Sequence, residues 1–433
     1  MRPSLWTCAL VGMASVASAQ QRAPARGSAS AADTLRLTRQ QAIATALIRN
    51  PQLDVARQQT EQVRAQRVEG MAIPDPAVTA SLDDQTRFLG LGTAQSKNLA
   101  VDFVFPFPDK IRLQSSIGTA NVRSSEAQYR LLQQQVAATA DQAYNDVLLA
   151  EQHRRDLTEA DSLSRDFLLK TQARFNAGTV PRLDVIKAQV DVAQGTNDLI
   201  ANARDISNAR AALNRIVGRP LGSAIVLLDS LDVPPALPDL DAIEQKALMV
   251  RPEIADIEAQ QRAARLNSRL VREQSILPDI TLSAYRDFKG DQGTLYSAGL
   301  AFPIPVFLWQ HTRGDFAETQ HRELELDAAA RDVRAAIGQD VRTAYATADA
   351  AERQVIYIRD QLLPSAREAY RVATVSYGLG GLSALDVLDA RRSLLDAENQ
   401  YAEALAAANS ARADLERAAG TPLSTFAPGA SRE

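Results

Sequence analysis

Two aspartates in the last part of the sequence have a spacing that could do chemistry. Asp386 and Asp389 stand three residues apart in the segment SALDVLDA, so on a helix they share one face. Carboxylates gathered on one face raise each other's pKa and attract cations. Ser383 and Asp386 also have the spacing of a capping box, in which the aspartate serves only its own helix N-terminus. From these residues alone, the capping role is the favoured interpretation of Asp386.

The other candidate residues form no recognised catalytic or metal-binding pattern. The histidines His153, His311 and His321 are widely spaced and no H-E-x-x-H pattern is present, so a tetrahedral metal site is not expected. Asp83 and Asp84 are adjacent, and adjacent residues of a strand point to opposite faces. The sequence has no Walker loop, G-x-S-x-G elbow or dinucleotide fingerprint. It therefore predicts no enzyme, no cofactor and no metal site.

Composition narrows the class of protein further. The 433 residues carry a formal net charge of −4, and without a basic surface nucleic acid is not an expected partner. Aromatic residues make up only 5% of the chain, and alanine, glutamine, arginine and aspartate dominate long segments. This composition favours long, narrow helices packed through small side chains.

The N-terminal residues have the features of an export signal. Residues 1–19 combine Arg2, an apolar run and the ending Ala-Ser-Ala, which predicts a secretory signal peptide. Cys8 lies inside it, so the mature chain is expected to have no disulfide. Residues 20–34 are predicted to be a disordered lead-in. Beyond them no apolar run reaches about 18 residues, so no membrane-spanning helix is expected.

The segment that carries the two aspartates occurs twice. Val375–Arg391 aligns with Ala173–Gln189 at an offset of about 202 residues, a fixed-period self-similarity. Each copy predicts a reversal between two helices, with a glycine in the left-handed backbone conformation. Thr179 and Ser383 are expected to cap the helices that follow.

The chain therefore divides into two structural repeats with one hairpin tip each. The predicted organisation is a first repeat at 35–221 with its tip at about 175–182, a connection at 222–239, a second repeat at 240–423 with its tip at about 377–384, and a short tail at 424–433.

Each repeat also contains one predicted β-hairpin. Apolar residues alternate with small or polar ones in strands expected at about 77–84, 99–107, 279–286 and 296–304. Four strands of this length fit the wall of a transmembrane barrel, but they cannot close one. Open strand edges are not tolerated in lipid, so a membrane role requires oligomerisation, and three copies would supply about a dozen strands. The alternative is a pair of soluble hairpins that cap a helical body.

Long helices are predicted on both sides of each tip. Asp109–Phe175 and Trp309–Tyr377 lack proline apart from Pro364, where a new segment is expected to begin. The returning helices are expected at Pro181–Val217 and Ser383–Ala419. Their apolar spacing predicts an antiparallel coiled seam, which in the first returning helix is formed by Leu183, Ile186, Val190, Leu199, Ile206, Leu213 and Ile216.

Together, the export signal, the duplication and the tip motifs RFNAGTVPRLDV and SYGLGGLSALDVLDA resemble the TolC family of outer-membrane efflux channels. The resemblance implies a mainly α member of the α+β class: a homotrimer whose β-hairpins form one twelve-stranded transmembrane β-barrel, continuous with an α-helical periplasmic tunnel. It implies the outer membrane of a Gram-negative bacterium, a periplasmic membrane-fusion adaptor and an inner-membrane pump of the resistance-nodulation-division type. The FPFPDK segment and the compact size look more like the CzcC- and CusC-like heavy-metal branch.

The resemblance also implies functional residues. Asp386 and Asp389 would narrow the periplasmic gate, where three copies would gather their carboxylates, and Tyr377 would help to hold the tip closed. The sequence departs from better-known members at Leu382, where they carry an arginine. We expect apolar packing around Leu379 and Leu382 to replace that ionic contact.

The resemblance places adaptor docking at the two tips. The docking residues would be Gly178, Thr179, Val180, Gly380, Gly381 and Leu382; without the family context they would be plain connecting turns. The predicted function is a passive conduit of a tripartite efflux system, with heavy-metal cations or drugs as substrates. The alternative is a soluble periplasmic coiled-coil structural or adaptor protein.

Overall fold

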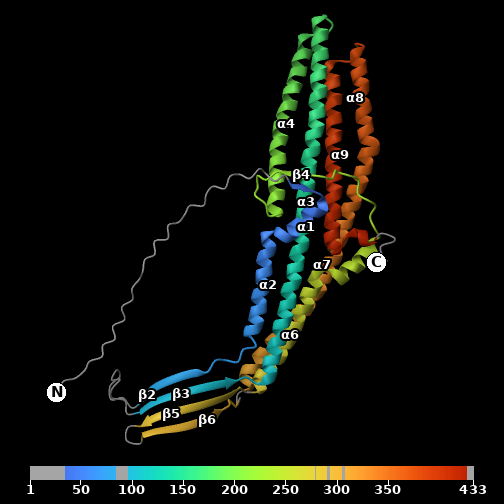
Figure 1. The fold of residues 1–433 in the computed structure, drawn as a ribbon. Coiled ribbons are helices and arrows are strands. Elements are labelled where there is room, and N and C mark those ends of the chain that lie inside the picture. The colour runs from blue at the N-terminus through green and yellow to red at the C-terminus, as the bar shows by residue number, and fades with distance from the viewer. Residues whose placement is uncertain (1–34, 84–95, 278, 290–292, 305–307, 427–433) are drawn as a thin grey trace, which may run out of the picture.

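The long helices of this protein stand side by side, with a β-sheet at one end and two helical tips at the other (Figure 1). The structure is a computed structural model that describes residues 35–83, 96–277, 279–289, 293–304 and 308–426. The expected signal peptide at 1–19, the lead-in at 20–34, Asp84 and the end of the tail lie outside the described residues, as does the side chain of His311.

The duplication is visible in the order of the elements. The first repeat contains β1 (Leu35–Leu37), α1 (Arg39–Arg49), α2 (Pro51–Glu69), β2 (Ala77–Asp83), β3 (Ser96–Phe105), α3 (Pro108–Asn176) and α4 (Arg182–Ile216). After the connecting strand β4 (Ile225–Leu227), the second contains α5 (Leu240–Val250), α6 (Pro252–Ile276), β5 (Ile280–Lys289), β6 (Gly293–Ala301), α7 (Leu308–Tyr357), α8 (Leu363–Gly378) and α9 (Ala384–Ala419). A short 3-10 helix, Leu423–Phe426, follows α9.

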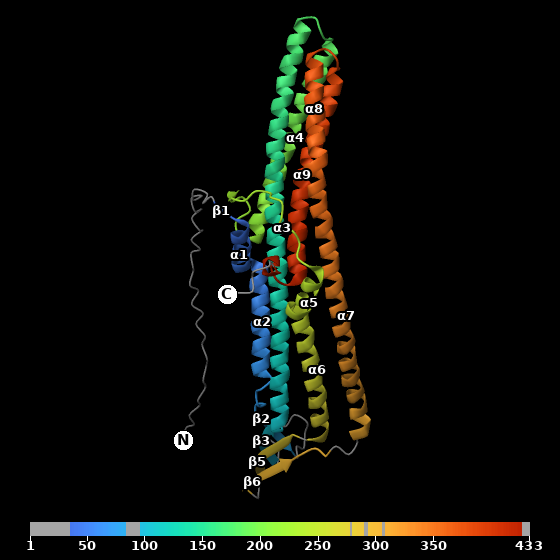
Figure 2. The same cartoon turned by 90° about the vertical axis from the view of Figure 1, so that its right-hand side faces the viewer.

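The helices form a wall rather than a bundle. Towards the tips, α4, α3, α9 and α8 lie side by side (Figure 1), and towards the sheet the order is α2, α3, α6 and α7 (Figure 2). Helix α3 has 69 residues and takes part in both halves of the wall. Within the part of the chain that the structure describes, no second layer of long helices covers either face of this wall.

Each repeat has its own apolar core at mid-height, built in the same way. In the first, Ala42 and Ala46 of α1 pack with Leu213 of α4. In the second, Ile243 and Ala247 of α5 pack with α9. Strands β1 and β4 pair in parallel beside the first core. The short helices thus fasten the long ones near their middle.

The two β-hairpins join in one antiparallel sheet with the order β2-β3-β5-β6. Cross-strand partners share a face, and the register pairs Val78 with Val101 and Phe103 with Leu282. The opposite face carries small and polar residues, where Ser283 donates a hydrogen bond to Asp102. The apolar face is open to solvent in a single copy, since Val78 is 67% exposed. Strands β2 and β6 are the two edges of this sheet.

The strands begin and end near the expected residues, with shifts of a few positions. Strand β3 begins at Ser96 rather than about 99, and β6 spans Gly293–Ala301 rather than 296–304. None of the helices within the described residues has an apolar stretch long enough to cross a bilayer.

The second long helix is interrupted where the first is continuous. A π-helical turn, Ile358–Leu362, separates α7 from α8, and Pro364 follows it. Proline has no N–H and its ring crowds the carbonyl four residues earlier, so the wider π turn accommodates it. The new segment expected near Pro364 is therefore present as α8.

Near the tip, the seam predicted in the first returning helix is not the face that is buried in the single chain. Leu183, Ile186 and Val190 are all about half exposed, whereas Val185 and Ala188 form the buried face of α4 there. Farther from the tip the prediction is correct, because Ile206, Leu213 and Ile216 are buried.

Glycine is required most strictly just after α4. Gly218 has φ +69°, and a Cβ added there would lie 2.4 Å from the carbonyl oxygen of Arg49. Gly178 has a similar φ of +74°, but a Cβ added there would meet nothing within 4 Å. We expect Gly178→Ala to cost only the left-handed strain of about 1–2 kcal/mol and Gly218→Ala to cost clearly more, because the backbone of α1 must move.

Thermal unfolding of the purified protein, followed by circular dichroism, would compare the two variants. Gly178→Ala is the matched control for backbone strain. Equal melting temperatures for the two variants would contradict the role assigned to the close approach of Arg49.

Candidate functional site

The two tips are built by the same turn. In the first, the N–H groups of Gly178 and Thr179 donate to the carbonyls of Phe175 and Arg174 at 2.9 and 3.0 Å. In the second, those of Gly380 and Gly381 donate to Tyr377 and Ser376 at 3.0 and 2.9 Å. Bonds of this kind close a helix when a left-handed residue follows it, and both Gly178 and Gly380 have positive φ.

The helices that leave the two tips begin differently. Ser383 caps α9 in a complete capping box with Asp386. The cap expected from Thr179 is wrong, because α4 begins after Pro181 without a side-chain cap. The hydroxyl of Thr179 instead donates to the carbonyl of Arg174 at 2.9 Å. The proline restricts the chain before α4, so the helix starts two residues later than a threonine cap would place it.

Asp386 and Asp389 lie on the exposed side of the first turns of α9. Val387, between them, is buried at 1% exposure and marks the opposite side of the helix. The carboxylate of Asp386 accepts hydrogen bonds from the backbone N–H and the hydroxyl of Ser383, at 2.8 and 2.7 Å. These two bonds hold the pKa of Asp386 below its ordinary value. In the single chain the capping role is therefore present, and the carboxylate stays ionised.

Tyr377 is anchored between the two helical hairpins. Its ring is 5% exposed and lies 5.3 Å from the ring of Phe167 on α3. Its hydroxyl donates to the hydroxyl of Thr171 at 3.4 Å. The Arg174 guanidinium lies over the ring, 4.5 Å from its centre, and donates to the carbonyl oxygen of Tyr377. Cation–π and hydrogen-bond contacts of one arginine thus join α3 to α8.

The predicted apolar packing of Leu379 and Leu382 is absent from the single chain. Leu379 is 85% exposed and Leu382 is 40% exposed. The contact that joins the hairpins at this level comes from Arg174, which the sequence reasoning missed. The sequence carries only a weak indication of this contact: Arg174 stands beside an aromatic residue in RFNAG, but its partner is 203 positions away.

The residues predicted to dock an adaptor lie at the same end of the molecule, opposite the sheet (Figure 1). Five of them, Gly178, Thr179, Gly380, Gly381 and Leu382, are exposed. Val180 is partly buried and packs against the cluster that contains Phe167 and Tyr377.

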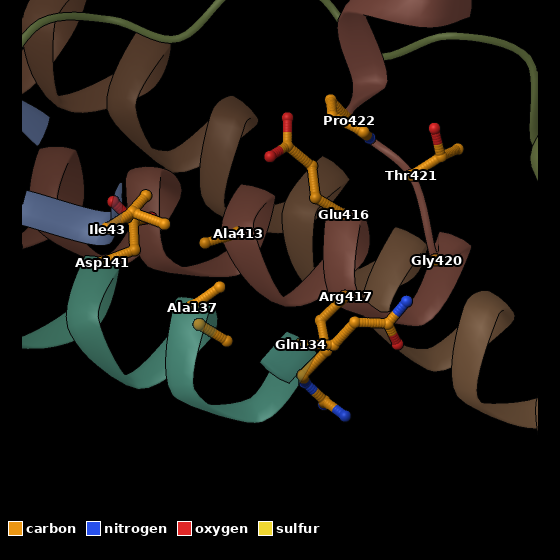
Figure 3. A pocket seen from close by; sticks show the side chains of 11 residues that line it. Ile43, Gln134, Ala137, Asp141, Ala413, Glu416, Arg417, Gly420, Thr421 and Pro422 are labelled. Atoms are coloured by element: carbon orange, nitrogen blue, oxygen red, sulfur yellow. The ribbon is translucent and has the colours of Figure 1, made fainter. Parts of the chain in front are cut away.

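A hollow of about 180 Å³ lies at mid-height between α3 and α9 (Figure 3). Asp141, on its wall, is buried and accepts hydrogen bonds from Arg39 at 3.0 and 3.3 Å. Burial raises the pKa of Asp141, and Arg39 opposes that shift. Arg39 also donates to Asn145, so this network fastens α1 to α3 beside the joint between the repeats. Among the described residues, no three His, Cys, Asp or Glu side chains are grouped so as to hold a metal ion.

Comparison with known proteins agrees with the duplication. The model of the family described as "Outer membrane efflux protein" matches residues 42–219 and again 243–421. The chain is 22% identical over 395 residues to the cobalt-zinc-cadmium resistance protein CzcC of Cupriavidus metallidurans, covering 89% of this chain and 90% of that protein.

Solved channel structures share the fold. The outer-membrane channel OprN matches with a TM-score of 0.74 at 20% identity, over 89% of this chain and 90% of that one. CusC matches with a TM-score of 0.73 at 19% identity, over 88% and 92%. The predicted mainly α fold, with duplicated long helices and β-hairpins, is confirmed by these matches and by the elements described above.

The family match confirms that the chain is an outer-membrane efflux channel, as predicted from the sequence. Members are transport proteins without enzymatic activity, which confirms the prediction that the chain is not an enzyme, and the soluble adaptor interpretation is set aside. The repeated match over most of the sequence shows that this chain belongs to the TolC-like outer membrane efflux protein family, the outer-membrane channels of tripartite efflux systems in Gram-negative bacteria, with a helical extension into the periplasm.

Proposed function

We propose that three copies of this chain form one efflux conduit, closed at its periplasmic end by a ring of carboxylates from Asp386 and Asp389. The observation that carries this proposal is the placement of both aspartates on an exposed face at the tip end of α9. Three copies would bring six carboxylates together at one constriction.

The shape of a single copy supports the assembly. Four strands with two unpaired edges and an exposed apolar face match one third of a twelve-stranded barrel, because lipid tolerates no open sheet edge. The helical wall has open edges at α2 and α4 on one side and at α7 and α8 on the other (Figures 1 and 2). Neighbouring copies would pair with the free strand edges and pack against the open helical edges at the same time.

The proposed partners include an adaptor that docks at the tips. The exposed tip residues Gly178, Thr179, Gly380, Gly381 and Leu382 would contact a periplasmic membrane-fusion adaptor, with Val180 supporting them from below. An inner-membrane pump of the resistance-nodulation-division type would supply the substrate. The conduit itself needs no catalytic group, because the pump provides both energy and selection.

Heavy-metal cations are the substrates that we favour over drugs. The support is the likeness over nearly the whole chain to a protein named for resistance to cobalt, zinc and cadmium, together with an acidic gate that attracts cations. The metal would be cargo in transit and would need no resident site.

Substrate class can be tested by complementation. We expect the chain, co-expressed with its own adaptor and pump in a host that lacks its outer-membrane channels, to raise the tolerated concentration of zinc, cobalt or cadmium about tenfold, while drug tolerance stays unchanged. A parallel host that carries the Asp386→Asn/Asp389→Asn variant shows whether loss of the gate carboxylates changes the tolerated metal concentration. Increased tolerance to drugs without increased tolerance to metals would reverse the assignment.

Channel recordings in planar bilayers test the gate. We expect the wild-type protein to prefer cations and to be blocked by divalent ions, and Asp386→Asn/Asp389→Asn to lose most of both properties, since the ring of charge is removed. Asp166→Asn is the matched control, because Asp166 is an exposed aspartate of α3 whose charge is paired with Lys170. An unchanged ion preference in the double variant would leave the conduit intact and refute the gate.

Leu382→Arg tests whether the missing arginine matters. A guanidinium at this level can pair with tip carboxylates, so we expect lower conductance and longer closed periods than in the wild type. Leu379→Arg places the same charge on a more exposed tip residue and serves as the control. Conductance that is equal in Leu382→Arg and wild type would remove position 382 from the gating region.

A further inference from the structure

Behind the proposed gate, one arginine joins three helices of the two hairpins. Arg391 of α9 forms an ion pair with Asp191 of α4. Its guanidinium also donates to the carbonyl oxygen of Ala160 on α3, at 3.3 Å. That oxygen accepts a second hydrogen bond from the hydroxyl of Ser164, at 2.8 Å. Arg391 therefore connects the second hairpin to both helices of the first.

Both side chains of this ion pair are largely shielded from solvent. The side chain of Arg391 is 11% exposed and that of Asp191 is 10% exposed. Most other ion pairs of the described residues are different, because at least one partner is well exposed: Lys170 and Asp166, also near the tip, are 63% and 57% exposed. Exposed pairs of that kind contribute little to stability, whereas a buried pair that loses one partner leaves an uncompensated charge in the interior.

The pair is also incompletely satisfied. Asp191 Oδ2 and Arg391 Nε are buried and have no hydrogen-bond partner. Buried polar atoms usually find partners, so this ion pair carries a cost that an apolar contact would not. Two apolar side chains would fill the same space without that cost, and what a directional charge pair adds is a defined register between helices.

The position of the pair links it to the gate. Arg391 follows Asp389 by two residues on the same helix, and Val387 and Ala384 on its buried side pack in the apolar cluster that contains Phe167 and Tyr377. A helix transmits a displacement along its axis as a rigid element. Any shift of α9 relative to α4 at Arg391 would therefore move both gate carboxylates.

We propose that the Arg391–Asp191 pair is the positioning contact that sets where the gate carboxylates lie, by holding α9 in register with α3 and α4. This inference rests on the proposed gate at Asp386 and Asp389. Arg391 and Asp191 do not contact the permeating ion; they act through the placement of α9. Loss of either charge frees the start of α9 from the first hairpin, so the constriction widens and fluctuates.

The test uses purified full-length protein in planar bilayers. We expect Arg391→Gln and Asp191→Asn each to raise the mean single-channel conductance by about twofold or more, with increased current noise and weaker cation preference, because the buried charge that remains has lost its partner. The charge-exchanged variant Arg391→Asp/Asp191→Arg restores the attraction, so it should recover a large part of the wild-type conductance and ion preference. Lys170→Gln is the control, because it removes a tip cation whose ion pair is exposed.

The outcomes separate this inference from the gate itself. If the wild type forms no channel, the proposed function fails. If Asp386→Asn/Asp389→Asn changes ion preference while folded Arg391→Gln and Asp191→Asn trimers behave as wild type, only the positioning contact is refuted. Melting temperatures are measured for every variant: a fall in melting temperature without any change in conductance or ion preference would assign the pair a purely structural role and overturn the proposal.

Discussion

Close packing along α3 is the constraint on which the rest of the structure depends. This helix contacts α1, α2, α4, α6 and α9, and its buried positions include many alanines, such as Ala120, Ala127, Ala140 and Ala150. Small side chains let several helices approach one helix along its whole length. The consequence is a wall that is one helix thick, and such a wall buries too little apolar surface to be a finished structure.

Features that depend on neighbouring residues could be predicted from the sequence. The capping box at Ser383 and Asp386, the glycines of both tips and the interruption before Pro364 all follow from local backbone chemistry. The alternation that assigned four strands is equally local. The duplication then placed each feature twice, and the fold class followed from the family resemblance that these motifs carry.

Contacts between the hairpins could not be predicted in this way. Arg174 meets Tyr377, and Arg391 meets Asp191, across separations of 203 and 200 residues. Neither pair occupies equivalent positions in the two repeats, so the duplication carried no signal for them. The seam predicted near the first tip differs from the face buried in the single chain for a related reason: Leu183 and Ile186 have the right spacing, but burial within one chain depends on how α3 and α9 pack against α4. Apolar spacing shows that a helix has an apolar face, but which face is buried depends on the helices that pack against it.

The two tips have diverged in a way that bears on the gate. At equivalent positions, the first tip carries Asp184 and Lys187, which can neutralise each other, and the second carries Asp386 and Asp389. A like-charged pair exposed at a constriction would tend to take up protons. Ser383 opposes this by donating two hydrogen bonds to Asp386, and the helix N-terminus favours negative charge there. The capping role and the proposed gate role of Asp386 therefore reinforce each other: the cap keeps the carboxylate ionised, and an ionised carboxylate is what a cation-selective ring requires.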